Sequence, residues 1–514
     1  VNTFGKHSIN ATLGVEAQKT NWSNMYAKVY DVPEDADLRY LSMSSNKENL
    51  EVSGGASHNS LLSGFFRFNY SYDARYLFTG TFRADGSSKF KKKWGYFPSF
   101  SAGWNVMEEA FMENLKEHSV LSQLKLRAGW GHVGNQASAG DFDYLALMTN
   151  GYTAVFGDSQ VDGAIQKKLA NEELSWETSE QYNVGLDYAL FNGALSGNVD
   201  YFIRNTKDMI LDTPIPIYAG MWRPKTNAGS VRNSGLEFAL NYADRIGKDF
   251  SFNLGFNISF IKNKVTSLGG GEPLYGTYTK TEVGQTMASF YGLQTAGIFK
   301  TQELLDKHVK DGKAIQPNAG LGDIIFVDQN NDGVIDDNDR IYLGSANPNY
   351  TYGFNLSLAY KGFDLNAFIQ GSQGNEIANY MYSVLYSTSM REWSNSKKMM
   401  NRWTPDNPNS DLPRVHSGDP NQNDRFSDRY VEDGSYIRLK TLQLGYTIPD
   451  KISRKVLLNK ARIYVSADNL FTSTHYSGFN PEMGDLWGNP LNAGVDMASY
   501  PTPRVFTVGI NLNF

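Results

Sequence analysis

Residues 352–360 read Tyr-Gly-Phe-Asn-Leu-Ser-Leu-Ala-Tyr, an unbroken alternation of large apolar residues with glycine, alanine and small polar residues. Side chains of an extended strand point alternately to its two faces, so one face of this segment is apolar and the other is small and polar. After a short turn at residues 361–362, residues 363–370 repeat the alternation. The pattern predicts two antiparallel strands that share an apolar face.

The same alternation recurs in residues 62–72, 76–85, 124–132, 182–190, 195–203, 236–242, 252–260 and 461–467. Many of these segments alternate over about nine residues, which is longer than the roughly five or six residues of an ordinary soluble strand. About 9–11 residues are enough for a tilted strand to cross a bilayer. The sequence therefore predicts an all-β protein with roughly fourteen strands of a transmembrane antiparallel β-barrel.

The connections between these strands alternate in length. Short ones lie at residues 73–75, 191–193, 246–248 and 361–362, and long ones occupy about 18–56, 134–174, 264–282, 300–346, 372–428 and 472–502. Tight periplasmic turns and long extracellular loops are typical of outer-membrane barrels. No linker interrupts the pattern, so we expect one continuous barrel domain over residues 1–514.

Composition limits the alternatives. The chain has 48 Lys and Arg against 54 Asp and Glu, a formal net charge of −6, so nucleic-acid binding is not indicated. It has no cysteine, which excludes disulfide frameworks and thiolate metal sites. Aromatic residues make up 13% of the chain, and no apolar run is long enough for a membrane-spanning helix.

A soluble β-sandwich would also alternate apolar and polar residues. Three features favour a barrel instead. The apolar stripes often begin or end in Tyr or Phe, as the aromatic girdles at the two membrane interfaces require. The opposite face is rich in Asn, Ser, Thr and Gly, which suits an aqueous lumen. The chain closes on an alternating strand, residues 506–514, whose terminal Phe514 resembles the insertion signal of bacterial outer-membrane barrels.

Short motifs follow one another along nearly the whole chain. They are Arg-Ala-Asp-Gly-Ser-Ser-Lys-Phe at 83–90 and further motifs at 95–104, 124–131, 134–136, 227–229, 233–237, 322–324, 429–440, 466–472 and 478–482. Together they resemble the SusC/RagA family of TonB-dependent outer-membrane transporters. The resemblance implies a barrel of about 22 strands, of which this chain would form the C-terminal portion. We expect the plug domain, the TonB box and the first strands to be supplied by a remaining N-terminal part outside this chain.

The resemblance also implies a location and a function. It indicates the outer membrane of a Bacteroidota-type bacterium, contact with outer-membrane lipid, and two partners, a SusD-like surface lipoprotein and the TonB complex acting through the plug. The implied function is active import of oligomeric nutrients, either glycans or peptides, without enzymatic activity or an organic cofactor. A passive porin and a soluble carbohydrate-binding β-protein are the alternative interpretations.

Residues 328–339 match the calcium-loop pattern D-x-[DN]-x-[DN]-G over its first six positions. This pattern predicts a structural Ca²⁺ bound by Asp328, Asn330, Asp332, the carbonyl of Val334, Asp336 and Asp339. The last position is Asp rather than Glu, and this shorter side chain is expected to weaken the affinity. Because the flanking sequence does not predict two helices, an acidic solvated turn is the alternative interpretation.

Candidates for catalysis are few. The seven histidines are scattered, and none has the His-x-x-x-His spacing of a zinc site. Candidates for substrate binding are aromatic residues of the long loops, since planar rings can stack on sugars or pack against peptide side chains. These are Tyr380, Tyr382, Tyr386, Trp393, Trp403 and Trp487. The alternative is that these rings pack the loops together.

Overall fold

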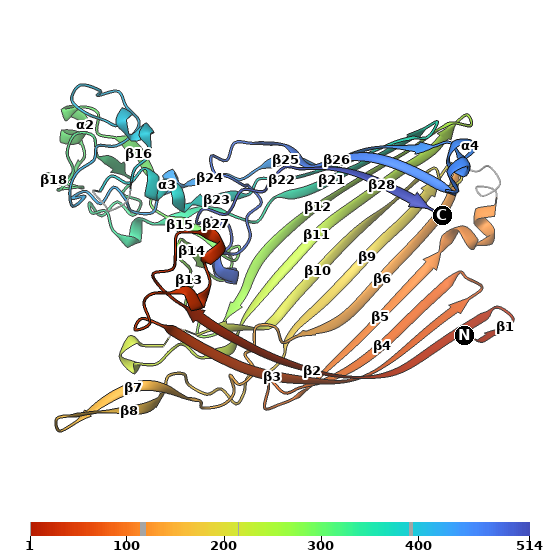
Figure 1. Ribbon diagram of the computed structural model, residues 1–514, viewed down its shortest axis with the longest axis horizontal. Coiled ribbons are helices and arrows are strands. Elements are labelled where there is room, and N and C mark those ends of the chain that lie inside the picture. Colours follow the sequence, from red (N-terminus) through yellow and green to blue (C-terminus); the bar gives the residue numbers. More distant parts are fainter. Residues whose placement is uncertain (1, 114–119, 214, 390–393) are drawn as a thin grey trace. The chain divides into compact units, whose positions relative to one another are not determined.

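The computed structural model of the protein describes residues 2–113, 120–213, 215–389 and 394–514 (Figure 1). Its internal contacts divide the chain into two compact units. Unit 1 comprises Val1–Trp104, Ala128–Tyr182 and Arg204–Ser230, and unit 2 comprises Asn105–Arg127, Asn183–Ile203 and Val231–Phe514. The boundaries fall inside strands rather than at linkers, and the expectation of a single domain over residues 1–514 stays a prediction.

Within the described ranges, fifteen strands are hydrogen-bonded in chain order in one large sheet. The prediction of roughly fourteen strands is therefore confirmed. The strands are β1 (Asn2–Phe4), β2 (His7–Lys28), β3 (Glu51–Tyr72), β4 (Tyr76–Ser87), β5 (Trp94–Asn105), β6 (Leu121–Asn135), β9 (Glu177–Leu190), β10 (Leu195–Asp212), β11 (Lys225–Ile246), β12 (Phe250–Leu268), β21 (Tyr350–Tyr360), β22 (Phe363–Gln373), β25 (Tyr436–Ile448), β26 (Lys460–Thr474) and β28 (Val505–Asn513).

The register in unit 2 follows the apolar alternation. Leu356 of β21 lies opposite Leu254 of β12 and Ala367 of β22, so apolar side chains share one face. Ser357 lies opposite Asn366 and donates a 2.8 Å hydrogen bond to it on the other face. The turn between β21 and β22 has φ of 47° at Lys361 and 92° at Gly362, which are the positive values that a two-residue hairpin turn requires.

Aromatic pairs mark the two ends of these strands. Near the short turns, the rings of Tyr242 and Phe252 pack with their centroids 5.2 Å apart. At the opposite ends, Phe260 and Tyr350 pack 5.6 Å apart. The eight residue steps from Phe252 to Phe260 rise roughly 20 Å along a tilted strand, close to the apolar band of about 25 Å that outer-membrane barrels present to lipid. We call the Phe260–Tyr350 pair the outer girdle.

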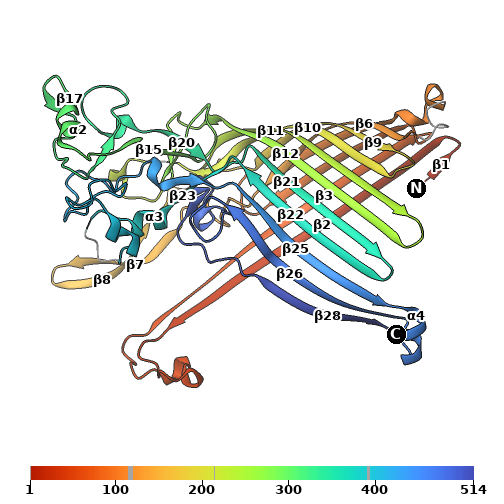
Figure 2. The ribbon, with the colours of Figure 1, turned by 90° about the horizontal axis from the view of Figure 1, so that it is seen from above.

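In unit 1, the prediction of one long loop at residues 18–56 is wrong, because β2 and β3 extend into this range. All of β2 pairs with β3, from His7↔Tyr72 to Lys28↔Glu51, whereas β4 pairs only with Leu61–Tyr72. Residues 19–28 and 51–60 therefore form a two-stranded ribbon (Figure 2). The outer connection of unit 1 at 134–174 also contains a hairpin, β7 (Met148–Phe156) with β8 (Ser159–Gln166). Polar residues predominate in the ribbon, and β7 does not alternate regularly, so hydropathy alone did not predict these strands.

The long connections of unit 2 pack together at one end of β12, β21, β22 and β25 (Figure 1). We call residues 269–349, 374–389, 394–435 and 475–504 the loop assembly. Its strands are β13 (Leu274–Tyr275), β14 (Thr279–Thr281), β15 (Ser289–Gly292), β16 (Thr295–Ile298), β17 (Val309–Lys310), β18 (Lys313–Ala314), β19 (Ile324–Phe326), β20 (Ile341–Ser345), β23 (Glu376–Asn379), β24 (Val431–Asp433) and β27 (Val495–Asp496).

The helices within the described ranges are short. They are α2 (Gln302–Lys307), α3 (Tyr380–Leu385) and α4 (Asp450–Ser453), and the 3₁₀ turns are η1 (Ala36–Leu38), η2 (Leu41–Met43), η3 (Val106–Glu108), η4 (Ala110–Met112), η5 (Ile217–Ala219), η6 (Asp337–Asp339), η7 (Lys397–Asn401), η8 (Asp428–Tyr430), η9 (Arg454–Val456), η10 (Leu486–Gly488) and η11 (Pro490–Asn492). In the described part of the chain, no helix has the length and apolar content needed to cross a membrane.

Two buried clusters form the core of the loop assembly. One contains Leu293, Ile298, Ile324, Phe326 and Trp403. The other contains Phe290, Ala378 and Val495, with Tyr278, Phe426 and Val431 packed against it. Each cluster joins segments that lie far apart in the chain, so the loop assembly has a packed interior of its own.

Candidate functional site

A bulge in β25 directs basic side chains to the polar face of the sheet. The register between β22 and β25 shifts between Phe368 and Ile369, where Lys440 is one extra residue of β25. A bulge of this kind re-aims the side chains next to it. Arg438 lies opposite Gln370 of β22 and Thr472 of β26, and its guanidinium group donates to the Thr472 hydroxyl at 2.8 Å.

Glu482 joins the loop assembly to this basic pair. Its carboxylate contacts Arg438 in a short ion pair and lies 3.3 Å from Nζ of Lys440. It also accepts hydrogen bonds from the hydroxyl of Tyr436, at 3.3 Å, and from the amide of Gln370. Arg438 is almost completely buried, so this charge-assisted contact is desolvated on the Arg438 side. The motifs at 429–440 and 478–482 therefore meet at one point.

A second ion pair fixes the loop assembly from inside. Asp323 is fully buried, and Arg414 binds its two oxygens through Nε at 2.7 Å and Nη2 at 2.6 Å. The N–H of Gly320 and the amide of Asn423 donate to the same carboxylate at 2.8 and 2.9 Å. Three kinds of donor therefore contact this carboxylate, so both of its oxygens have hydrogen-bond partners although the side chain is buried.

Neighbouring amide side chains satisfy the backbone of β19. Gln316 donates to the carbonyl of Ile324 at 3.0 Å and accepts the N–H of Phe326 at 2.9 Å. Asn423 accepts the N–H of Ile324 at 2.9 Å, and Asn421 donates to Asn423 at 2.7 Å. These amides replace a missing partner strand, because buried backbone groups need hydrogen-bond partners.

Burial acts on the pKa values of several carboxyl groups of the loop assembly, among them Asp419, Glu376 and Asp424. Burial raises the pKa of Asp419 above its ordinary value, although the N–H groups of Asp424 and Asn423 oppose the shift. Burial also raises the pKa of Glu376, against the N–H of Ser345. At Asp424 burial acts in the same direction, but hydrogen bonds from residues 387–389 outweigh it and lower the pKa.

The predicted calcium ligands lie on an exposed turn, apart from Asp339. Asp328 accepts the N–H groups of Asp332, at 3.1 Å, and Gly333, at 2.8 Å. Asn330 donates from its amide to Asp332 at 2.8 Å. Asp339 is buried and accepts the N–H groups of Gln329, at 2.9 Å, and Asp336, at 2.8 Å. Gly333 has a φ of 90°, as the predicted sharp turn requires.

These contacts test how well the turn fits a metal ion. Backbone N–H groups and the Asn330 amide occupy oxygens that the calcium pattern assigns to the ion. Among the residues described by the structure, no group of three or more His, Cys, Asp or Glu side chains is placed to hold a metal ion. The carboxylates therefore do not converge on a site in this structure, and calcium binding by residues 328–339 stays a prediction.

Three of the predicted substrate-binding rings belong to one aromatic chain. Tyr382 and Tyr386 stack with centroids 4.2 Å apart, and Tyr382 meets Tyr430 edge-on at 6.0 Å. Tyr380 lies 6.1 Å from Tyr278, which stacks on Phe426 at 4.2 Å. These rings are half-buried or buried between segments, an arrangement that favours the packing role. Ligand binding by Tyr380 and Tyr382 stays a prediction.

The three predicted tryptophans have different outcomes. Trp403 is buried in the cluster with Ile324 and Phe326, so it packs the interior of the loop assembly rather than presenting its ring on a loop surface. Its indole N–H has no hydrogen-bond partner in the described part of the molecule. Trp393 lies outside the described residues. Trp487 belongs to η10, and its predicted role in substrate binding stays untested.

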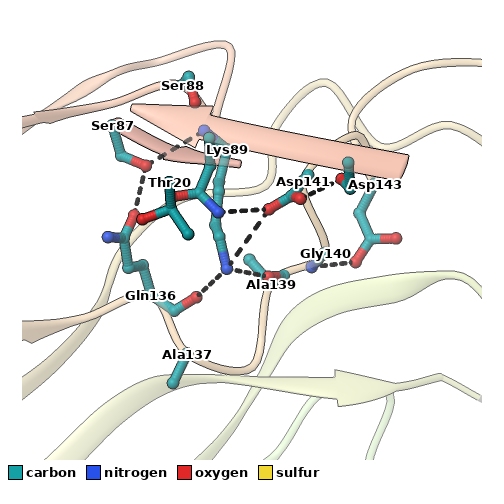
Figure 3. Close-up of polar contacts among 12 residues, drawn as sticks. Thr20, Ser87, Ser88, Lys89, Gln136, Ala137, Ala139, Gly140, Asp141 and Asp143 are labelled. Carbon is teal, nitrogen blue, oxygen red and sulfur yellow. Dashed lines mark hydrogen bonds and ion pairs between the residues drawn. The ribbon is translucent and has the colours of Figure 1, made fainter. Parts of the chain in front are cut away.

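In unit 1, a lysine fixes the connection that follows β6 (Figure 3). Lys89 donates from Nζ to the carbonyl oxygens of Ala139, at 2.8 Å, and Gln136, at 3.5 Å, and lies 3.8 Å from the Asp141 carboxylate. Asp141 also accepts the amide of Asn59 at 3.0 Å. A groove of about 440 Å³ lies beside this cluster, lined by residues that include Leu61, Leu62, Ser87, Ser88 and Trp94.

Sequence reasoning did not assign roles to Arg438, Glu482, Asp323 or Arg414. The motifs at 322–324, 429–440 and 478–482 contained three of these residues, but their spacing along the chain does not show that they meet. The Asp323–Arg414 pair spans 91 residues. The only signal in the sequence for these residues was that the motifs of the outer connections contain charged side chains.

Comparison with known proteins identifies the family. A family profile described as "TonB dependent receptor-like, beta-barrel" matches residues 2–470. TonB-dependent receptor P3 of Formosa agariphila is 35% identical over 100% of this chain and 51% of its own length. TonB-dependent receptor SusC of Bacteroides thetaiotaomicron is 32% identical over 94% of this chain and 45% of its own length. The chain thus spans about half the length of the curated relatives it matches.

Solved structures agree with this assignment. The structure titled "Structure of the RagAB peptide transporter" superposes on the chain with a TM-score of 0.81 at 26% identity, covering 100% of this chain and 54% of the other. The same transporter in the "open-open" state superposes with a TM-score of 0.80. Proteins of this family are transporters and receptors rather than enzymes. The chain belongs to the TonB-dependent receptor β-barrel family and is a protein of the bacterial outer membrane.

Proposed function

We propose that this chain is the barrel portion of an importer for oligomeric nutrients, glycans or peptides, driven by the TonB complex and assisted by a SusD-like surface lipoprotein. The similarity to SusC and to the RagAB peptide transporter supports this proposal. The apolar face of the strands contacts lipid, and the polar face borders the transport path. A passive porin would need no energy input, so dependence of uptake on TonB distinguishes an importer from a porin.

The observation that carries the proposal is the contact between Glu482 of the loop assembly and Arg438 and Lys440 of the wall. It anchors an outer loop directly to the polar face. Such an anchor places loop side chains over the path that a large solute must take. Displacement or rearrangement of this loop would then open or close the path, as selective import of an oligomer requires.

The test uses the full-length transporter in its own bacterium, with uptake of fluorescent oligosaccharides and oligopeptides as the readout. We expect uptake of one class, and its loss when TonB is deleted. Glu482→Gln should reduce uptake several-fold at an unchanged amount of protein in the outer membrane. Glu303→Gln is the matched control, because Glu303 lies on α2 of the same assembly and forms an exposed ion pair with Lys307 one turn away.

Two outcomes would contradict the proposal. Uptake that continues without TonB would identify a passive pore. Uptake of neither class of oligomer, with smaller solutes still transported, would contradict the assignment of cargo size. A Glu482→Gln variant that transports normally while the wild-type protein depends on TonB would leave the importer in place and remove the role of the loop anchor.

Calcium is a separate proposal that rests on the sequence pattern of residues 328–339. The supporting observation is the φ of 90° at Gly333, which gives the sharp turn that the calcium pattern requires. A bound ion would replace the amide of Asn330 as the partner of Asp332 and would stiffen the turn. It would have no part in transport chemistry.

A further inference from the structure

A four-stranded sheet of the loop assembly carries a cluster of tyrosines on one of its faces. It pairs β13, β14, β15 and β20 in that order, and its neighbouring strands are all antiparallel. The whole sheet lies in the chain between Phe260 and Tyr350, the two residues of the outer girdle. It therefore belongs to the outer connections of unit 2 rather than to the strand wall (Figure 1).

The register assigns the side chains of this sheet to two faces. On one face, Phe290 is buried in the interior of the loop assembly. On the other face, Tyr275 lies opposite Lys280, and Tyr291 lies opposite Tyr342. The ring centroid of Tyr291 lies 6.5 Å from that of Tyr275 and 5.4 Å from that of Tyr342. The ammonium group of Lys280 lies 4.7 Å from the centroid of Tyr291. We call Tyr275, Lys280, Tyr291 and Tyr342 the tyrosine face.

Charge is balanced within the tyrosine face. The carboxylate of Glu282 lies 3.0 Å from Nζ of Lys280 and accepts a hydrogen bond from the hydroxyl of Tyr342. Tyr275 is 58% exposed, and its hydroxyl has no hydrogen-bond partner among the residues that the structure describes. The surface therefore presents an accessible aromatic ring and free hydrogen-bonding capacity, and its lysine and carboxylate neutralise each other.

The turn that carries Tyr275 is fixed from outside the sheet. Asn492 accepts the N–H of Thr277 at 2.7 Å, and the N–H of Gly276 donates to the carbonyl of Thr279 at 3.0 Å. A Cβ atom at Gly276 would lie 2.4 Å from the side-chain oxygen of Asn492, so this close approach requires glycine. An exposed ring on a fixed turn has little freedom left to lose when a ligand binds, which favours binding.

We propose that Tyr275, Tyr291 and Tyr342 form a binding face for a neutral sugar chain. The inference rests on the proposed function, since it specifies a cargo and a cargo site of the same importer. A sugar ring has an apolar side that stacks on aromatic rings. Its neighbouring hydroxyl groups need a donor and an acceptor side by side, which Lys280 and Glu282 supply.

A peptide is the less suitable occupant of the tyrosine face. Peptides commonly bind by adding a strand to a free sheet edge, and β13, the edge strand that ends at Tyr275, has only two residues. Recognition of charged peptide groups would need an unbalanced charge, whereas Lys280 and Glu282 are paired with each other. The contacts that the face offers are therefore better suited to hydroxyl groups and to the apolar side of a sugar ring.

The experiment measures ligand binding to the purified full-length transporter by isothermal titration calorimetry. The probes are neutral oligosaccharides of about six glucose, xylose or mannose units, and peptides of similar mass. We expect at least one of the oligosaccharides to bind, and we expect Tyr275→Ala to weaken its binding about tenfold. Tyr275→Phe keeps the aromatic ring and should retain most of the affinity.

Tyr500→Ala is the matched control. Tyr500 also belongs to the loop assembly and is 90% exposed, but it lies outside the four-stranded sheet. Its substitution removes an exposed ring of the same kind and should leave binding of the oligosaccharide unchanged. Limited proteolysis of each variant shows that the loop assembly is still folded, so a loss of binding is not a loss of structure.

Three results would overturn the inference. Equal binding by the wild type and Tyr275→Ala would show that the tyrosine face is not the site. Binding of peptides alone, lost in Tyr275→Ala, would assign the face to a peptide. Binding of no oligosaccharide would remove a neutral sugar chain as the ligand. In all three cases, uptake that still depends on TonB would leave the proposed importer in place, whereas TonB-independent uptake with normal sugar binding would contradict the importer alone.

Discussion

The strand wall and the loop assembly of unit 2 use apolar side chains in opposite ways. In the wall, apolar residues point away from the protein, and Phe506 and Val508 of β28 are 72% and 76% exposed. In the loop assembly, Phe290 and Phe326 are both 0% exposed. The wall depends on lipid to cover its apolar face, whereas the loop assembly buries its apolar residues within the protein. One chain therefore contains a strand wall that faces lipid and a loop region with a buried core of the kind found in water-soluble proteins.

The two regions also handle charge differently. On the polar face of the wall, charged side chains pair with each other, as where Arg462 donates to Asp364 at 2.9 Å. The loop assembly places Asp323 in its interior and compensates it with Arg414 and two further donors. The alternation of polar and apolar residues therefore predicts which face of the wall each side chain occupies. It does not predict the interior of the loop assembly, because a polar group is buried there only where a hydrogen-bond or ion-pair partner from another segment meets it.

Removing the partner of the buried carboxylate should have the largest effect. Arg414→Met leaves Asp323 charged and buried, and we expect it to destabilise the loop assembly by about 3–5 kcal/mol. Adding Asp323→Asn to this variant should restore part of the loss, because no uncompensated charge is then buried. Limited proteolysis of the folded barrel measures the effect. Equal sensitivity of the single and double variants would contradict the role of the pair.

Reversing the polarity of the wall should have the next largest effect. Leu356→Arg puts a charge on the lipid-facing side near the middle of β21, and we expect it to cost about 2–4 kcal/mol. Ser357→Arg, one residue further, points to the polar face and should be tolerated. A folding assay of the full-length barrel in lipid vesicles compares the two variants. If both have the same stability, the assignment of the two faces is wrong.

A smaller effect concerns pH. Burial raises the pKa of Glu376 above its ordinary value of 4.5, so the folded protein favours the protonated form. Its contribution to stability is complete below pH 4.5 and decreases as the pH rises through the raised pKa. Glu376→Gln should therefore make the stability of the loop assembly less dependent on pH. Thermal unfolding from pH 4 to pH 8 measures this, with Glu303→Gln as an exposed control that should behave like the wild type.

The smallest expected effect is that of calcium on the turn at 328–339. If the turn binds the ion, calcium should protect it from protease, and a chelator should remove the protection without changing the wall. Asp332→Ala should abolish the difference, whereas Asp311→Ala, outside the predicted set, should keep it. Cleavage at the same rate with and without chelator would count against calcium binding.

The sequence was sufficient to predict the wall. Alternation identified most of its strands, and the turn at residues 361–362 has the positive φ values that a tight hairpin needs. The period of two is visible because lipid and water lie on opposite sides of a single strand. The prediction was incomplete at residues 19–28 and 51–60, since polar residues outside the apolar band can pair through their backbone without any hydrophobic pattern.

The loop assembly could not be predicted in the same way. Trp403 was a candidate for stacking on a ligand, with packing of the loops as the alternative, and in the structure it packs against Ile324 and Phe326. That contact, like the Asp323–Arg414 pair, joins segments about eighty or ninety residues apart. Local patterns carry no information about such pairings. The acidic turn is the exception, since its spacing is local, but spacing alone does not show whether an ion is bound.

The extra residue in β25 has a consequence for comparing relatives. Between Lys440 and the periplasmic end of β25, the inward-facing residues are the odd-numbered Thr441 and Gln443. Between Lys440 and the outer end, they are the even-numbered Arg438 and Tyr436. Deleting this single position would turn the guanidinium toward hydrocarbon and Ile437 toward water. A one-residue gap at this position of an alignment therefore exchanges the inward-facing and lipid-facing side chains of β25. No substitution at this position can have that effect.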